Sequence, residues 1–147
     1  MVFATRDSLT PLDGTEVIYT VIEATNPFES GDTTGKYMTV RFDWPIPQGI
    51  TETISGEPRF VAENISYTPE VEIRNNDFAA IPTRGILFTT RKKVLIENNI
   101  FRNMAMESIF ISNDSNAWYE SGPVKDMTIR NNVFYLQNAD MGGRAKV

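Results

Sequence analysis

The sequence predicts an all-β protein in which the coils of a parallel β-helix, or solenoid, follow a small antiparallel β-barrel-like or sandwich insert. Three observations predict this fold. A phrase of the form Ile-x-Asn-Asn-x-Phe occurs three times, at Ile73–Phe78, Ile96–Phe101 and Ile129–Phe134. The first two copies start 23 residues apart and the last two 33 residues apart, a spacing typical of solenoid repeats. The segments between copies hold short β-rich runs broken by Asn, Gly and Pro, without the paired helices that a helical repeat requires.

Composition narrows the classes of function. The 147 residues are 41% hydrophobic, which is enough for one ordinary domain or two small ones. A net charge of −5 and the absence of any basic run argue against a nucleic-acid partner. The chain has no Cys and no His, so catalysis would depend on carboxylates, Tyr, Lys or Arg, and we expect no cofactor. No apolar run is long enough to span a membrane, and the first residues lack the pattern of a signal peptide.

Residues 1–58 are expected to form the antiparallel insert, with four to six short strands. Residues 17–24 are a β-branched run and residues 36–43 alternate polar and apolar side chains, so both are predicted strands. The stretch between them is rich in turn formers, and Pro45 and Pro47 exclude a central strand directly after them. The acidic side chains of this half are interpreted as solvated surface.

Residues 59–147 are expected to form the coils. The Ile and Phe positions of the repeat should stack inside the solenoid, and the second Asn of each copy should bond the same amide in the next coil. These stacks are Ile73, Ile96 and Ile129, then Phe78, Phe101 and Phe134, and the ladder of Asn76, Asn99 and Asn132. The Asn residues could be taken for substrate ligands, but repetition at constant phase is what a structural ladder requires.

The predicted coils have no amphipathic helix to cap them. After the third copy the chain continues through residues 135–147 without a further repeat. Uncapped coils expose strand edges and apolar ends. We therefore expect this chain to be a segment of a longer protein, or to form homo-oligomers through its solenoid ends.

The second interval of the repeat is ten residues longer than the first, and the extra residues follow Asp114. Insertions in a solenoid form loops on one face, often the binding face. This loop places Asp114 and Glu120 beside Trp118 and Tyr119, with Asn113 directly before it. Aromatic faces stack on the C–H surfaces of sugars, amides bond hydroxyls, and two carboxylates can serve as acid and base. The loop is therefore a candidate site for carbohydrate chemistry.

Each residue of the loop also has a structural interpretation. Asp114 could cap local amides in a turn, and Asn113 could form that turn. Glu120 could be a solvated loop residue, and Trp118 and Tyr119 could pin the loop onto the solenoid.

Arg84 and Arg91 are further candidates for substrate binding. Arg84 precedes Glu107 by 23 residues, and Arg91 precedes Asp114 by the same interval. Each Arg therefore lies one coil from a carboxylate at a matching phase. The alternative is that both are surface salt bridges. The sequence lacks the repeated Asp-rich turn of calcium-binding solenoids, so we expect no metal site.

Three stretches, Thr68–Asn75, Arg84–Arg91 and Ile111–Val124, carry a family resemblance. They resemble the α-1,3-galactosidases of glycoside hydrolase family 110. Residues 41–47 look like the end of the small barrel that precedes the coils in that family. The resemblance implies a right-handed parallel β-helix and an inverting, metal-independent enzyme that removes terminal α-1,3-linked galactose.

The resemblance also implies roles for residues of the loop. Asp114 matches the acidic position of the family's Ser-Asn-Asp loop, and Trp118, Tyr119 and Glu120 match its Trp-Tyr-Glu motif. Asp114 and Glu120 would be the catalytic carboxylates, with the assignment of acid and base left open, and Trp118 would be the sugar platform. Members of the family are several times longer, so a catalytic residue could lie outside this chain and the chain alone could be inactive. A galactose-terminated glycan as substrate and a periplasmic or extracellular location are implied as well.

Two other functions fit the same residues. A carbohydrate-binding or adhesin-like solenoid would use the aromatic loop without hydrolysis. A purely structural repeat would use each Asn and Asp for turns.

Overall fold

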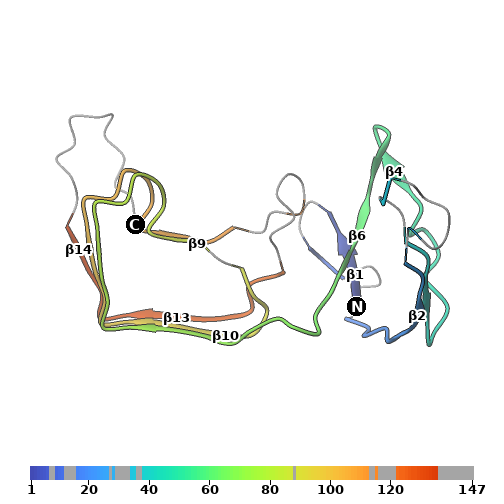
Figure 1. Ribbon diagram of the computed structural model, residues 1–147, viewed down its shortest axis with the longest axis horizontal. Helices are drawn as coiled ribbons and strands as arrows, with labels where there is room; N and C mark the ends of the chain where they lie inside the picture. Colours follow the sequence, from blue (N-terminus) through green and yellow to red (C-terminus); the bar gives the residue numbers. More distant parts are fainter. Residues whose placement is uncertain are drawn as a thin grey trace. The chain divides into compact units, whose positions relative to one another are not determined.

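The structure, a computed structural model, describes residues 1–6, 9–11, 16–26, 28, 34–35, 38–87, 89–112, 115 and 122–135. The chain forms two compact units, Met1–Tyr67 and Thr68–Val147 (Figure 1). This division lies nine residues after the boundary expected at residue 58, because the strand Phe60–Glu63 pairs with the first strand of the chain.

The first unit is built from short antiparallel strand pairs. Its strands are β1 (Val2–Thr5), β2 (Val21–Ala24), β3 (Val40–Phe42), β4 (Thr53–Ile54), β5 (Glu57–Pro58) and β6 (Phe60–Glu63). β1 pairs with β6, β2 with β3 and β4 with β5, each in antiparallel orientation. The antiparallel character agrees with the sequence. Among the described residues these strands form three two-stranded sheets and not one closed barrel.

An aromatic cluster forms the centre of the first unit. Phe3 of β1, Tyr19 and Phe42 of β3 meet edge to face, with ring centroids 5.0, 5.5 and 6.0 Å apart. Such pairs add about 0.5–1.5 kcal/mol each beyond the burial of their area. The N–H of Tyr19 donates to the carbonyl of Met1 at 2.9 Å. Because Tyr19 is bound to the start of the chain in this way, β2 begins at Val21 and is shorter than the sequence predicts.

Asp43 extends the contact between β2 and β3 past the end where β2 begins and β3 ends. The N–H of Thr20 donates to Asp43 Oδ1 at 2.9 Å, and the N–H of Asp43 donates to the carbonyl of Thr20 at 3.0 Å. The bond from the Thr20 backbone lowers the pKa of the Asp43 carboxyl below its ordinary value, because it favours the ionised form.

The second unit is a parallel β-helix, as predicted. Its strands are β7 (Val71–Arg74), β8 (Asp77–Ala79), β9 (Ile86–Leu87), β10 (Lys93–Glu97), β11 (Ile100–Arg102), β12 (Ile109–Phe110), β13 (Asp126–Arg130) and β14 (Val133–Tyr135). They stack into three parallel sheets, β7–β10–β13, β8–β11–β14 and β9–β12. Figure 1 shows the coils nearly end on, so that the strands of one sheet overlap and each sheet forms one side of the coil.

The Ile and Phe positions of the repeat stack in register, as predicted. Phe101 lies between Phe78 and Phe134, with ring centroids 5.0 and 5.1 Å away and ring planes 8° and 7° from parallel. Phe101 and Ile96 of the middle coil are completely buried, whereas Ile129 of the next coil is 41% exposed. A middle coil is covered on both sides and an outer coil on one, so burial decreases toward the ends of the stack.

The predicted Asn ladder is present beside these stacks. Asn99 is completely buried. Its side-chain oxygen accepts from the N–H and the Nδ2 of Asn76 at 3.0 and 3.2 Å. Its Nδ2 donates to the carbonyl of Ile73 at 2.9 Å and to Asn132 Oδ1 at 3.0 Å. All four hydrogen bonds that a side-chain amide can make are therefore formed.

The first Asn of each copy has a different role, because it forms the corner between two strands. Its φ is +57° at Asn75 and +56° at both Asn98 and Asn131. Asn tolerates this left-handed conformation better than most other residues. The sequence predicted the ladder but not the corner.

A row of alternating charge crosses the sheet β7–β10–β13. Both oxygens of Glu97 are paired, with Arg74 Nε at 3.1 Å and Arg130 Nε at 2.6 Å. The Glu97 side chain is only 11% exposed, so its two charge-assisted bonds are screened less than those of an open surface pair. The row links all three coils at one register.

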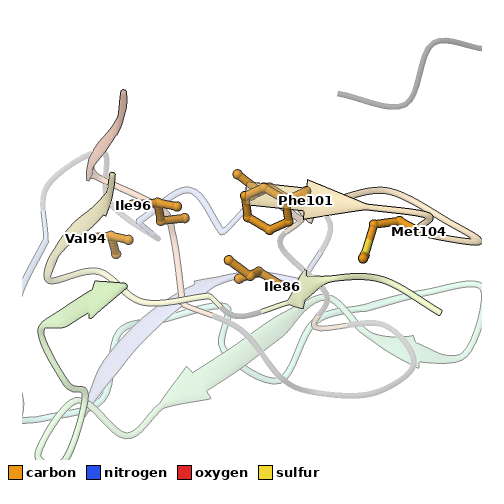
Figure 2. Packing of buried hydrophobic residues seen from close by; sticks show 6 residues of the cluster. Ile86, Val94, Ile96, Phe101 and Met104 are labelled. Atoms are coloured by element: carbon orange, nitrogen blue, oxygen red, sulfur yellow. The ribbon is translucent and has the colours of Figure 1, made fainter. Parts of the chain in front are cut away.

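The hydrophobic core of this unit joins its three sheets. Figure 2 shows Ile86, Val94, Ile96, Phe101 and Met104 pointing toward one another from β9, β10, β11 and the turn that follows β11. Residues far apart within one coil thus meet in a single apolar cluster.

Candidate functional site

The loop that follows β12 carries most of the predicted site residues. Five of these lie outside the described residues: Asn113, Asp114, Trp118, Tyr119 and Glu120. Around this loop the structure describes the residues up to Ser112, then Ser115, and the chain again from Gly122, which is buried and lies four residues before β13. The roles of the five residues stay predictions, and the described part of the site consists of the strands that carry the loop.

The structure brings Arg84 and Glu107 together, in agreement with their spacing of one repeat. Arg84 Nε lies 3.8 Å from Glu107 Oε2. The N–H of Gly85 donates to the carbonyl of Glu107 at 3.0 Å, and the pairing continues with Ile86 opposite Ile109. The two charged residues therefore occupy matching positions in neighbouring coils, just before β9 and β12.

Gly85 keeps these two strands close together. A Cβ at this position would lie 2.5 Å from the carbonyl oxygen of Ser108 and 3.1 Å from the sulfur of Met104. Only glycine allows such a close approach of backbone to backbone. The positions of the neighbouring Arg84 and Glu107 are therefore set by tight main-chain packing.

Phe110, the last residue of β12, supports the guanidinium of Arg84. The central carbon of the guanidinium lies 4.4 Å from the centroid of the ring, within the range of a favourable cation–π contact. Phe110 has no role among the predictions from the sequence. The signal that could have found it is an aromatic residue three positions after Glu107, within reach of the Arg one coil away.

The Arg84–Glu107 pair is open. Arg84 Nε and Glu107 Oε2 are inaccessible to solvent, and neither has a hydrogen-bond partner among the described residues. Their separation of 3.8 Å is too long for a hydrogen bond. The two side chains are nevertheless 35% and 37% exposed, so their remaining atoms reach the surface. They present guanidinium donors beside a carboxylate acceptor.

Arg91 lies in the turn between β9 and β10 and is partly buried. Its predicted partner, Asp114, is outside the described residues, so that second pair stays a prediction. The neighbouring Thr90 is buried and fixes the turn: its hydroxyl donates to the carbonyl of Pro69 at 2.8 Å and accepts from the N–H of Lys92 at 3.2 Å.

The described part of the chain contains no group of three or more acidic side chains that could hold a metal ion. It also contains no helix of the length and apolarity needed to cross a membrane.

Comparison with protein families places the coils in a known class. Residues 61–145 match the family model described as "Right handed beta helix region". The match covers more than half of the chain and includes every strand of the second unit. The predicted handedness agrees with this family.

Three curated proteins that are similar to this chain are named alpha-1,3-galactosidase A. Alpha-1,3-galactosidase A of Peterkaempfera griseoplana is 50% identical over 121 residues, which cover 78% of this chain and 16% of the relative. Alpha-1,3-galactosidase A of Streptomyces avermitilis is 47% identical over 132 residues, covering 90% and 20%. Alpha-1,3-galactosidase A of Bacteroides thetaiotaomicron is 53% identical over 85 residues, covering 58% and 15%. The resemblance to α-1,3-galactosidases is thereby confirmed, and the chain spans 15% to 20% of the length of these three relatives.

Proposed function

This chain belongs to the right-handed β-helix family, and we propose that it forms part of a glycoside hydrolase that removes terminal α-1,3-linked galactose from glycans. The observation that carries the proposal is its 47% identity to the α-1,3-galactosidase A of Streptomyces avermitilis, which covers 90% of this chain. A periplasmic or extracellular location belongs to the same proposal, because galactose-terminated glycans are found outside cells.

The proposed reaction inverts the anomeric carbon and uses Asp114 and Glu120. In an inverting enzyme one carboxylic acid protonates the leaving oxygen, while the other carboxylate activates a water on the opposite face of the sugar. Apolar surroundings raise the pKa of a carboxyl that must act as the acid. The aromatic rings of the same loop could supply such surroundings, and either carboxylate can take either role.

The remaining residues would bind the sugar. Trp118 would stack on the C–H face of the galactosyl ring, and Tyr119 and Asn113 would bond its hydroxyls. Arg84 and Arg91 would donate to hydroxyls from the edge of the coils. The open position of Arg84 above Phe110 supports its part of this proposal.

The decisive experiment places this chain in a complete enzyme. The matching 132 residues of the Streptomyces avermitilis enzyme would be replaced by this chain, and hydrolysis of α-1,3-galactosyl-galactose followed by NMR. We expect β-galactose as the first product, since inversion turns the α linkage into a β hydroxyl. Asp114→Asn and Glu120→Gln should each lower kcat by at least about 100-fold, the smaller end of the contribution of a general acid or base.

Asp126→Asn is the matched control, because Asp126 is an exposed carboxylate at the start of β13 in the same unit. It should leave kcat unchanged. A folded chimera that releases no galactose would contradict the proposal, as would Asp114→Asn and Glu120→Gln variants that both hydrolyse at the rate of the unchanged chimera. Release of α-galactose first would contradict inversion alone.

A further inference from the structure

The pair of Arg84 and Glu107 differs from other ion pairs in the described part of this chain. The Arg59–Glu52 pair closes to 2.6 Å, and the Arg41–Glu23 pair to 2.9 Å. Exposed pairs close in this way because a charge-assisted hydrogen bond is most favourable at about 2.7–2.9 Å. The atoms of Arg84 and Glu107 that face each other remain 3.8 Å apart.

Two contacts hold the guanidinium of Arg84 in this open arrangement. Phe110 binds its face at 4.4 Å, and the close approach of Gly85 to Ser108 fixes the backbone on which it stands. The guanidinium is thus positioned by the ring and the strand more than by the carboxylate. Glu107 is left beside it with acceptor capacity that the ion pair does not use.

The outward-facing atoms of the pair define the chemistry of a ligand. Because Arg84 Nε and Glu107 Oε2 are both inaccessible to solvent, a ligand would meet the terminal nitrogens of Arg84 and the other oxygen of Glu107. An anionic ligand would be repelled by the carboxylate and a cationic ligand by the guanidinium. A neutral diol fits both, since one hydroxyl can accept from Arg84 while its neighbour donates to Glu107.

We propose that Glu107 is a substrate-binding residue that acts together with Arg84, the two holding a pair of adjacent hydroxyl groups on the galactosyl unit. This inference rests on the proposed function and adds Glu107 to the residues that recognise the sugar. Arg84 lies just before β9 and Glu107 just before β12, and β12 leads directly into the loop that carries Asp114. Recognition by the pair and chemistry in the loop would therefore be joined through one strand.

Binding of a simple galactoside to the intact chain tests the inference. We would titrate the chain with methyl α-galactopyranoside and follow the backbone amide shifts of residues 84–87 and 107–110. Saturable shifts are expected at these residues. Glu107→Gln should raise Kd about tenfold or more, because hydrogen bonds to a charged group contribute more than neutral ones.

Glu72→Gln is the matched control, since Glu72 is an exposed carboxylate of the same unit that accepts from Arg74 Nη2 at 3.1 Å. It should leave Kd unchanged. Methyl α-glucopyranoside differs from the galactoside at one hydroxyl. The ratio of the two affinities is a second readout, which would not change if Glu107 had only a structural role. The unchanged chain should prefer the galactoside, and Glu107→Gln should reduce that preference while its thermal unfolding stays within a few degrees of the parent.

The outcomes separate this inference from the proposed function. Equal affinity of Glu107→Gln and the parent chain for the galactoside would overturn the inference, as would the absence of shifts at residues 84–87 and 107–110. Binding at the pair without any galactose release by the chimera would refute the hydrolase and leave the sugar site standing. Hydrolysis that requires Asp114, with KM unchanged in a Glu107→Gln chimera, would support the hydrolase and refute the role of Glu107 in binding the sugar.

Discussion

Asn99 joins three coils through one side chain. Its amide accepts from Asn76 and donates to Ile73 in the coil before it, and donates to Asn132 in the coil after it. The residue is completely buried, so water cannot replace any of these hydrogen bonds if one is lost. A buried polar group that loses its partner costs about 1–3 kcal/mol. The ladder therefore stabilises the stack mainly because breaking it would leave several such groups.

Asn99→Ala is expected to lower the free energy of unfolding by about 3 kcal/mol, because it leaves buried backbone and amide groups without partners. Chemical denaturation followed by circular dichroism would measure the change. Asn76→Ala is the control, since Asn76 is exposed at the end of the ladder. It should cost less than about half as much, because its backbone N–H still bonds Asn99. Equal losses in the two variants would show that burial of the central amide is not the source of the stability.

At the scale of elements, β9 and β12 are only two residues each, and the open pair Arg84–Glu107 lies directly before them. Such short strands contribute few ladder hydrogen bonds of their own. Their spacing is set instead by the contact of Gly85 with the carbonyl of Ser108, which leaves no room for a Cβ. The geometry of the candidate site thus depends on one glycine beside it.

Gly85→Ala is expected to lower the free energy of unfolding by about 1–3 kcal/mol, the usual cost of overpacking. The added Cβ of the alanine would push β9 away from β12. Thermal unfolding measures the stability, and the amide shifts of Ile86 and Ile109 report the separation of the strands. Thr83→Ala, an exposed change two residues away, should alter neither. A Gly85→Ala variant with parental stability and unchanged shifts would contradict the close approach.

At the scale of the whole molecule, each compact unit has its own aromatic centre. In the unit Met1–Tyr67 it is the edge-to-face cluster around Phe3. In the unit Thr68–Val147 it is the parallel stack around Phe101. The two centres use different geometry because antiparallel pairs bring rings together from several directions, whereas register in a solenoid places identical rings directly over one another.

Phe101→Ala is expected to cost about 3–5 kcal/mol, as for a large residue removed from a core, and to act on the solenoid unit. Hydrogen exchange read at single amides should lose protection in β10 and β11 and keep it in β1 and β6. Phe3→Ala is the reciprocal variant, with loss in β1 and β6. Equal loss of protection in both units from either change would mean that they unfold as one.

Much of the solenoid could be predicted from the sequence because its information is repeated. Phe78, Phe101 and Phe134 share one phase, and the structure stacks them. The spacing of Arg84 and Glu107 likewise predicted that they would meet. The first unit offered no repeat, so its strand partners and its boundary at Tyr67 depended on long-range pairing between β1 and β6, which local patterns do not encode.

The sequence by itself determined the coils, the Ile and Phe stacks and the Asn ladder, because residues that recur at constant phase must lie above one another in a stacked repeat. Only the tertiary structure decided that the Arg84–Glu107 pair stays open at 3.8 Å with the guanidinium over Phe110. The physical reason is that spacing along the chain places two residues in register but does not set the contacts of their side chains. Those contacts follow from the packing of Gly85 against Ser108 and of Arg84 against the ring.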